Sequence, residues 1–248
     1  MNIQILGCSG GVGGSSGSTC IRLNEHILID AGSGLGELPL AEMRKIKHVV
    51  LTHGHMDHIC FLPAFISNLF GHLDGSLKVY ALPKTIEVLR THIFNWQVWP
   101  DFEKLPSDNN PIMEFVSIEP WNPFSIGDIQ FTPFSVEHTV PTVGYSVQNQ
   151  DTHFVFAADT KCNDVLLDQL NRLPPIDIFM AECAFPDHAT EMAEISGHLT
   201  PATLKKTVAA LAVQPQHIWV THLKPAYEEE LRYTFAQDPE CQHWHVLS

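Results

Sequence analysis

The stretch Thr52-His53-Gly54-His55-Met56-Asp57-His58 decides how this sequence folds and what it binds. It follows the apolar run Val49-Val50-Leu51, which is typical of a short buried strand. Three imidazoles and one carboxylate stand within six residues, and these groups suit zinc and similar divalent ions. Side chains on so short a turn cannot all face one tetrahedral ion, but they can serve two adjacent ions. The stretch therefore predicts the centre of a dinuclear metal hydrolase.

Four later segments repeat this pattern of a short β-rich run followed by a polar residue. The residues that follow or end these runs are His138, Asp159, Glu182 and His222. Because the ends of neighbouring strands lie side by side in a sheet, we expect these residues to converge on the 53–58 turn. A lone histidine is more often structural, but this series favours ligation.

Strand and helix segments alternate along the whole chain, with no sign of a domain boundary. The sequence predicts strands at 3–6, 19–23, 26–30 and 77–81, and helices at 59–70, 83–94, 201–211 and 227–235. Thr200 is the expected N-cap of the helix that starts at Pro201. We therefore predict a single α/β domain over residues 1–248.

The glycine-rich loop at 7–18 does not match a dinucleotide-binding motif, since it lacks the last glycine and leads into a strand. Either its backbone passes close to a ligand, or it is a flexible connection. The segment 95–124 is rich in aromatic residues and proline and is predicted to be irregular. A lid, a subunit interface and a purine-stacking wall are all open for it, beside ordinary core filling.

The charge balance restricts the partners of this chain. Fourteen Lys and Arg face 28 acidic residues, a net charge of -14, so extended nucleic-acid binding is disfavoured. A small anionic substrate held by metal ions is compatible with this balance. The six scattered cysteines form no C-x-x-C pair and predict reduced thiols, and no run has the length of a membrane span. We expect a cytoplasmic protein without membrane contact.

The series His53-x-His55-x-Asp57-His58, then His138, Asp159 and His222, resembles the metallo-β-lactamase superfamily over essentially the whole chain. The resemblance implies an αββα sandwich with two divalent ions at one edge, zinc first and manganese as an alternative. It also implies ligand sets, in which Asp159 bridges the ions. His53, His55 and His138 would hold the first ion, and Asp57, His58 and His222 the second.

Two further motifs resemble the phosphodiesterase branch of that superfamily, namely Ala181-Glu182-Cys183-Ala184-Phe185 and Ser196-Gly197-His198-Leu199-Thr200-Pro201. Zinc β-lactamases typically have cysteine at the position of Asp159, which argues against lactam hydrolysis. The branch contains transfer-RNA 3′-processing endonucleases and class II cyclic-nucleotide phosphodiesterases. The endonucleases commonly carry a basic arm, whereas only Lys161 and Arg172 are basic between Asp159 and His198.

The resemblance thus implies hydrolysis of 3′,5′-cyclic nucleotides, cyclic AMP or cyclic GMP, to 5′-monophosphates by a hydroxide shared between the two ions. His198 is the expected proton donor to the leaving oxygen, with Glu182 orienting its ring. Asp57 would combine metal ligation with a hydrogen bond to the hydroxide. The alternatives are an RNA 3′-end endonuclease, a thioester or lactone hydrolase, and a non-enzymatic protein that binds cyclic nucleotides. Relatives are often dimers, so a homodimer is a further expectation.

Overall fold

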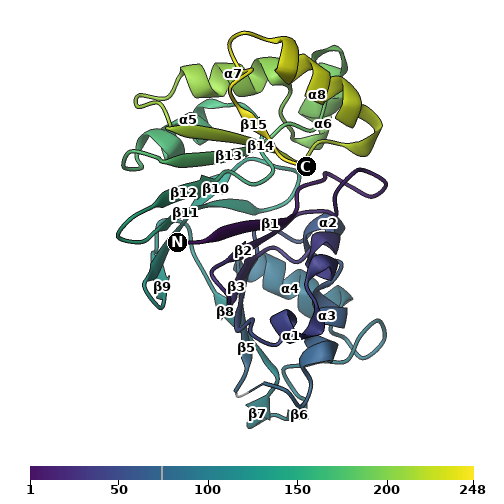
Figure 1. Ribbon diagram of the computed structural model, residues 1–248. Helices are drawn as coiled ribbons and strands as arrows, with labels where there is room; N and C mark the ends of the chain where they lie inside the picture. Colours follow the sequence, from purple (N-terminus) through teal and green to yellow (C-terminus); the bar gives the residue numbers. More distant parts are fainter. Residues whose placement is uncertain (74) are drawn as a thin grey trace. The chain divides into compact units, whose positions relative to one another are not determined.

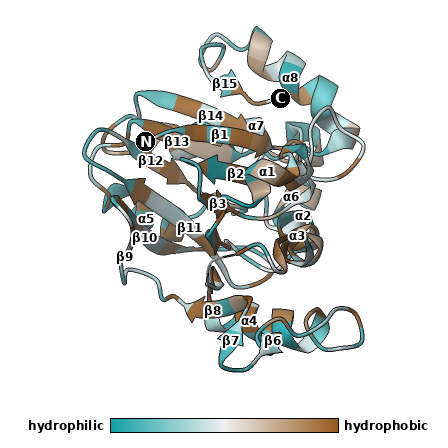
Figure 2. Cartoon of the chain, turned by 60° about the horizontal axis from the view of Figure 1, so that its bottom comes forward, coloured by the Kyte–Doolittle hydropathy of each residue, from teal (hydrophilic) through white to brown (hydrophobic). Residues whose placement is uncertain are grey.

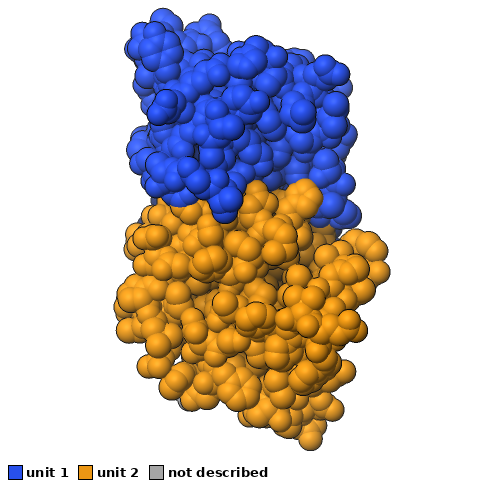
Figure 3. Space-filling view, turned by 90° about the vertical axis from the view of Figure 1, so that its right-hand side faces the viewer, with its two compact units in different colours: residues 1, 8–16, 119–248 blue, residues 2–7, 17–118 orange. Residues whose placement is uncertain are grey.

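The computed structural model describes residues 1–73 and 75–248. Contacts within the chain divide it into two compact units, drawn in different colours in Figure 3. Unit 1 comprises residues 1, 8–16 and 119–248, and unit 2 comprises residues 2–7 and 17–118. Each unit contains a β-sheet and its own helices (Figure 1). The single domain that the sequence predicts over 1–248 stays a prediction.

Unit 2 contains a six-stranded sheet in the order β1-β2-β3-β4-β5-β8. The first three strands are antiparallel, and β3, β4, β5 and β8 are parallel. The strands are β1 (Ile3–Gly7), β2 (Cys20–Leu23), β3 (Ile27–Ile29), β4 (His48–Val50), β5 (Leu77–Ala81) and β8 (Met113–Ser117). The helical elements are η1 (Ser33–Glu37), α1 (Leu40–Met43), α2 (Met56–Ile59), α3 (Leu62–Leu69) and α4 (Pro83–His92), and β6 (Pro106–Ser107) and β7 (Asn110–Pro111) form a small hairpin.

The core of unit 2 lies between its sheet and its helices. Leu28, Val49 and Val79 belong to one buried cluster with Phe65 and Ile66 of α3. The alternate positions of the same strands are also buried, as at Ile27, Ile29 and Val50. Strands buried on both faces carry near-continuous apolar runs, which is why Val49-Val50-Leu51 is recognisable in the sequence.

Unit 1 contains a seven-stranded sheet in the order β15-β14-β13-β12-β11-β10-β9. Strands β9 to β12 are antiparallel, and β12 to β15 are parallel. The strands are β9 (Phe124–Ile126), β10 (Ile129–Val136), β11 (Thr142–Gln148), β12 (His153–Phe156), β13 (Ile178–Glu182), β14 (His217–Thr221) and β15 (His245–Val246). The helical elements are α5 (Asp164–Asn171), η2 (Asp187–Ala189), α6 (Thr190–Ser196), α7 (Pro201–Ala209), η3 (Pro225–Tyr227) and α8 (Glu228–Gln237).

The core of unit 1 joins strand residues such as Val155, Phe179 and Val220 to Leu204 of α7 and Leu231 of α8. Figure 1 shows α5, α7 and α8 on the same side of this sheet. In Figure 2 the strand β14 is largely brown, hence hydrophobic, whereas teal, hydrophilic residues lie around the small hairpin of β6 and β7 in unit 2. Burial of alternate apolar strand residues under amphipathic helices is the main stabilising term of such a unit.

The predicted start of α7 is confirmed. The Thr200 side chain accepts a hydrogen bond from the backbone N–H of Thr203, and the Thr203 side chain accepts one from the Thr200 backbone. This reciprocal capping box satisfies two N–H groups that the first turn leaves unpaired. Pro201 occupies the first turn, where its missing N–H costs nothing.

The segment 95–124 is less irregular than the sequence predicts. It contains β8, which pairs in parallel with β5, and the hairpin of β6 and β7. Phe102 is buried, and Phe115 packs against the core of unit 2, so core filling is confirmed for these two rings. Trp96 is 58% exposed. The prolines around β8 obscured a strand whose partner lies 36 residues earlier in the chain, as in the pairing of Met113 with Leu77.

Within residues 1–73 and 75–248, the structure has no helix whose length and apolar character would carry it across a membrane. The six cysteines are free thiols, as their spacing predicts.

His153 makes the stability of unit 1 depend on pH. Its Nδ1–H donates to the Pro175 carbonyl oxygen at 2.8 Å, and its Nε2 accepts from the Ser146 hydroxyl at 2.8 Å. Burial lowers the pKa of His153, and the Pro175 hydrogen bond and Asp177 charge offset this only in part. The fold therefore favours the neutral ring, and this stability is complete above about pH 6.5 and lost as the pH falls below it.

We expect the wild-type protein to lose unfolding free energy between pH 7.5 and 5.5 faster than a His153→Gln variant. Groups other than His153 titrate in both proteins, so the difference isolates this ring. Urea unfolding at the two pH values measures it. Parallel losses in the two proteins would assign the pH dependence to other groups.

Candidate metal centre

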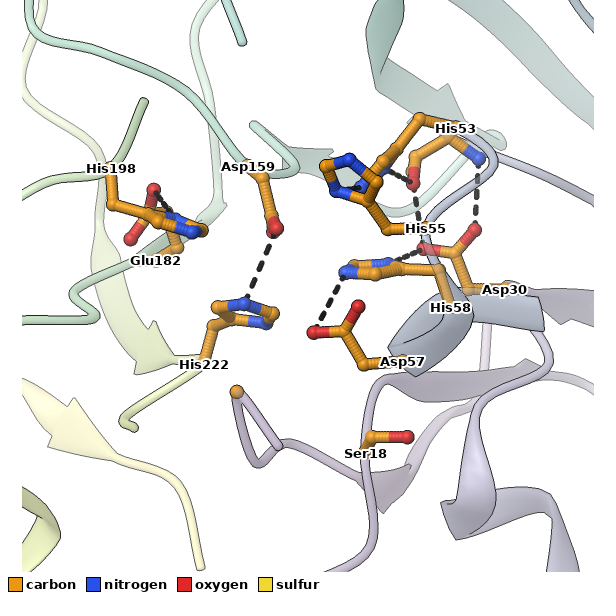
Figure 4. A network of polar contacts seen from close by, with 12 residues as sticks. Ser18, Asp30, His53, His55, Asp57, His58, Asp159, Glu182, His198 and His222 are labelled. Carbon is orange, nitrogen blue, oxygen red and sulfur yellow. Dashed lines mark hydrogen bonds and ion pairs between the residues drawn. The ribbon is translucent and has the colours of Figure 1, made fainter. Parts of the chain in front are cut away.

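In unit 2, the segment that follows β4 gathers the four predicted ligands of the first motif (Figure 4). The Nε2 of His53 lies 3.1 Å from the Nδ1 of His55. The rings of His53 and His58 are 4.2 Å apart, and the Nε2 of His58 lies 4.0 Å from the Oδ2 of Asp57. His55 is the N-cap residue of α2, so one turn of helix presents Asp57 and His58 directly after the two imidazoles.

Asp30 orients two of these imidazoles, a role that the sequence analysis missed. Its Oδ2 accepts a hydrogen bond from the Nδ1–H of His58 at 2.7 Å and from the Thr52 hydroxyl at 2.8 Å. Because the Thr52 hydroxyl donates its hydrogen to Asp30, its oxygen accepts a hydrogen bond from the Nδ1–H of His53 at 3.0 Å. Both rings therefore present Nε2 as the ligand atom, as in carboxylate–histidine–metal arrangements.

The environment of Asp30 matches that role. The residue is fully buried, and burial raises the pKa of its carboxyl group. The charge and hydrogen bond of His58 and the hydrogen bonds from Thr52 lower that pKa by a smaller amount. A sequence signal for it existed, because Asp30 ends the run Ile27-Leu28-Ile29 in the same way that the predicted ligands end their strands.

Replacing Asp30 with Ala should lower the unfolding free energy of the metal-free protein by about 3–5 kcal/mol, because a buried partner of three donors is removed. Urea unfolding after chelation measures this loss. The matched control is Asp128→Ala at an exposed turn, which should change stability by less than about 0.5 kcal/mol. A loss below about 1 kcal/mol for Asp30→Ala would contradict the orienting role.

In unit 1, Asp159, Glu182 and His222 stand at or just after the ends of the neighbouring strands β12, β13 and β14, as expected, whereas His138 follows β10, which β11 separates from β12. Glu182 and Thr221 are paired at the ends of the parallel strands β13 and β14, and His222 follows directly. The Asp159 carboxylate lies between two imidazoles, its Oδ2 3.3 Å from the Nε2 of His222 and 3.8 Å from the Nε2 of His138. All of these side chains are buried, including that of His138, which is 1% exposed.

Glu182 and His198 form a buried pair beside those ligands. The Nδ1–H of His198 donates to the Oε1 of Glu182 at 2.8 Å (Figure 4). The same carboxylate accepts the backbone N–H groups of Thr160 at 3.2 Å and Ala184 at 3.1 Å. Burial raises the pKa of Glu182 more than His198 lowers it. Burial lowers the pKa of His198, but the charge and hydrogen bond of Glu182 outweigh it, so the pKa of His198 is raised.

His198 also lies among the predicted metal ligands of unit 1. Its ring is 5.0 Å from the ring of His138 and 5.4 Å from that of His222. The ligand atoms of His138, Asp159 and His198 lie within 4.8 Å of one another, close enough for one ion. A role in metal binding therefore competes with the predicted role of His198 as a proton donor.

Backbone strain marks three strand ends at these residues. Asp30, Ala158 and His222 have positive φ angles of 57°, 56° and 62°. Residues other than glycine rarely adopt this left-handed region, and strained positions of this kind cluster at functional sites. Each of the three either is a site residue or directly precedes one.

The N-terminal loop approaches His222 within unit 1. The His222 N–H donates to the Cys8 carbonyl oxygen at 2.6 Å, and the Gly10 N–H donates to the Leu223 carbonyl oxygen at 3.0 Å. A Cβ atom at Gly10 would lie 2.4 Å from the His222 carbonyl oxygen, so only glycine fits there. These contacts hold the loop against His222, and its passage close to a ligand stays a prediction.

Gly197 supports His138 by its conformation and by its size. It ends α6 with a φ of 75°, and its carbonyl oxygen accepts the Nδ1–H of His138 at 2.9 Å. A Cβ atom at Gly197 would lie 2.8 Å from that Nδ1. The bond leaves Nε2 of His138 as the ligand atom.

Gly197→Ala should therefore lower stability by about 1–2 kcal/mol and weaken metal affinity about 10-fold or more. Gly127→Ala is the matched control, since Gly127 has a φ of 62° with nothing near its Cβ position. The Gly127→Ala variant should lose stability but keep the metal affinity of the wild type. Urea unfolding and competition with a chelator measure the two quantities, and equal metal affinity in both variants would contradict the contact with His138.

The donor sets of both units fit divalent metal ions. They consist of imidazole nitrogens and carboxylate oxygens, which suit zinc, and His53, His58 and His138 each have the Nδ1 engaged so that Nε2 is the ligand atom. The clusters are thus able to bind metal.

Comparison with known proteins agrees with this chemistry. Residues 25–223 match the family described as "Beta-lactamase superfamily domain". A "Probable 3′,5′-cyclic-nucleotide phosphodiesterase" of Yersinia pestis is 26% identical over 211 residues, which are 75% of this chain and 59% of that protein. A ribonuclease Z of Metallosphaera sedula is 30% identical over 159 residues, which are 61% of this chain and 50% of that protein. This chain therefore spans only 59% and 50% of the lengths of these relatives.

Solved structures share the fold. The crystal structure of unliganded yeast PDE1 superposes with a TM-score of 0.77 at 18% identity, over 98% of this chain and 95% of that one. The short form of human tRNase Z superposes with a TM-score of 0.70 at 17% identity, over 91% of this chain and 94% of that one. Both neighbours share the fold of this chain, in agreement with the fold class that the resemblance to the metallo-β-lactamase superfamily implies.

Proposed function

Since this chain belongs to the β-lactamase superfamily, with its mixed α/β metallo-β-lactamase fold, we propose that it is a metal-dependent phosphodiesterase that hydrolyses 3′,5′-cyclic nucleotides to 5′-monophosphates. The observation that carries the proposal is the buried pair of His198 and Glu182, joined at 2.8 Å beside the imidazoles of His138 and His222. A proton donor next to metal ligands suits a bond whose leaving alkoxide must be protonated.

The proposed cofactors are two divalent ions, zinc first and manganese as an alternative. One ion would be held by His53, His55 and His138. The other would be held by Asp57, His58 and His222. Asp159 would bind both ions. When bound, the ions activate a water molecule and neutralise charge on the phosphate oxygens. The position of the Asp159 Oδ2 near the imidazoles of His138 and His222 supports its shared role.

The protein's own groups then act on the leaving group. The Nδ1–H of His198 is held by Glu182, so Nε2 is the atom that carries the proton to the ribose 3′ oxygen. Glu182 also stabilises the charged form of the ring, in line with the raised pKa of His198. Asp57 is half-buried and is proposed to add a hydrogen bond to the attacking water.

The charge balance supports a small substrate over RNA. The two relatives named above are, by their printed names, a probable cyclic-nucleotide phosphodiesterase and a ribonuclease, so similarity to them alone favours neither function. This chain has a net charge of -14, and gripping several RNA phosphates requires clustered Lys and Arg. We therefore place the RNA 3′-end endonuclease second.

A cytoplasmic location and a homodimer complete the proposal. All six cysteines are free thiols, which suits a reducing compartment. Trp96 and Val98 are exposed on segment 95–124 and are candidates for burial against a second copy.

The test is to incubate purified protein with 3′,5′-cyclic AMP or GMP, a 2′,3′-cyclic nucleotide, a pre-transfer-RNA and a thioester, with and without chelator. We expect a 5′-monophosphate from the first substrate, loss of product with chelator and recovery with zinc or manganese. Cleavage of the pre-transfer-RNA alone would replace the proposal by the endonuclease. Tight binding of a cyclic nucleotide without any product would favour the non-enzymatic alternative.

A further inference from the structure

A row of aromatic side chains extends from His198 within unit 1. The Phe185 ring lies 5.8 Å from the His198 ring, and the Tyr227 ring lies 5.8 Å from the Phe185 ring. The His188 ring follows at 6.2 Å from Tyr227, nearly perpendicular at 76°. Successive rings are thus within the spacing of aromatic contacts.

The row leads from the buried pair to the surface. Phe185 is 8% exposed, Tyr227 is half-buried, and the His188 side chain is 65% exposed. Tyr227 is therefore partly exposed to solvent, and the more deeply buried ring of Phe185 lies next to it. No hydrogen bond engages the Tyr227 hydroxyl among the residues that the structure describes.

The outer rings are held in position by the local fold. Tyr227 ends the turn η3 directly before α8, and its N–H donates to the Lys224 carbonyl oxygen at 2.8 Å. The Nδ1 of His188 lies 3.2 Å from the Glu230 carboxylate. Phe185 and Tyr227 pack among three alanines, Ala184, Ala189 and Ala193. Such pre-organised rings lose little conformational entropy when a flat ligand stacks on them.

The proposed reaction indicates which flat group of a ligand would lie against this row. If His198 protonates the ribose 3′ oxygen, the ribose must lie on the His198 side of the phosphate. The base attached to that ribose then extends beyond His198, and the Phe185–Tyr227–His188 row is the aromatic surface that starts at His198. We propose that Tyr227, supported by Phe185 and flanked by the nearly perpendicular ring of His188, forms a stacking shelf for the nucleobase of the substrate. This inference rests on the proposed function and adds the residues that bind the base.

Stacking on the shelf favours any base, because every nucleobase has a π-face. Loss of one aromatic partner weakens base binding by about 10- to 100-fold. Because the shelf contacts the base and not the reacting phosphate, its loss should raise KM and leave kcat nearly unchanged.

The first experiment compares Tyr227→Ala, Tyr227→Phe and Tyr233→Ala with wild-type protein loaded with metal. Tyr227→Ala should raise the KM for 3′,5′-cyclic AMP by about 10- to 100-fold, with kcat within about threefold. Tyr227→Phe keeps the ring and should match wild type. Tyr233→Ala removes a 68% exposed ring from α8, the helix that follows Tyr227, and is the control. A KM within twofold of wild type for Tyr227→Ala would overturn the shelf.

The second experiment does not depend on turnover. Calorimetry of metal-loaded protein should show that 5′-AMP binds at least about 10-fold more tightly than ribose 5-phosphate, and that Tyr227→Ala abolishes this difference. Equal affinity of the two ligands for wild type would overturn the shelf. A protein that hydrolyses no cyclic nucleotide, yet prefers 5′-AMP through Tyr227, would retain the shelf and sink the proposed function. Equal weakening of both ligands by Tyr227→Ala would indicate a structural role and also reject the shelf.

Discussion

An Asp159→Ala protein is expected to retain fewer than two metal ions per chain and to lose turnover by about 1,000-fold or more. Asp159 is 2% exposed, and its Oδ2 lies near the Nε2 atoms of both His138 and His222. Its removal takes away a negative charge and an oxygen ligand that lies beside both imidazoles and is proposed to bind both ions. Buried cationic centres are held only where charge is compensated.

The measurement is the metal content after dialysis, with affinity from competition against a chelator. Asp159→Asn keeps the shape and one oxygen but lacks the charge, so it should fall between wild type and Asp159→Ala. Asp168→Ala removes an exposed carboxylate from α5 and should retain both ions. Two ions held by Asp159→Ala at wild-type affinity would remove Asp159 from the ligand set.

The second large effect concerns His198. A His198→Ala protein should hydrolyse a cyclic nucleotide about 100- to 10,000-fold more slowly while keeping its metal ions. The reason is that the Nδ1–H of His198 is bonded to Glu182, which makes Nε2 a proton donor to the leaving oxygen. If His198 is instead a metal ligand with His138 and Asp159, metal content should fall together with activity.

The leaving group provides a sharper test of the same role. A phosphodiester with an aryl leaving group needs little protonation, so its hydrolysis should be nearly insensitive to His198→Ala. Glu182→Gln should slow the cyclic nucleotide by a smaller factor, since it keeps a hydrogen-bond acceptor for the ring but not its charge. Equal slowing of both substrates by His198→Ala, with reduced metal content, would assign His198 to metal binding.

Local patterns predicted much of the structure. The 53–58 motif follows β4, and His138, Asp159 and His222 follow β10, β12 and β14. These predictions succeed because a buried strand carries an apolar run that ends where a polar side chain follows. Thr200 and Pro201 predicted the start of α7 correctly, because a helix cap depends only on residues that are close in the sequence.

Other features depend on residues that are distant in the sequence. The strand β8 is recognisable only through its pairing with β5. The carboxylate of Asp30 is 22 residues from Thr52 and 28 from His58. Nothing near Asp30 in the sequence indicates these partners, because their encounter is produced by the parallel pairing of β3 with β4.

The sequence by itself determined the kind of chemistry available to this protein, because ligand identity and spacing within a turn are local properties. It also determined the strand ends that carry the predicted ligands, because each apolar run ends where a polar residue follows. Only the tertiary structure decided which nitrogen His58, His138 and His198 present, through their hydrogen bonds with Asp30, Gly197 and Glu182. It alone brought Phe185, Tyr227 and His188 into one row beside His198. Those contacts join separate elements, so they exist only after the strands have paired and the helices have packed on them.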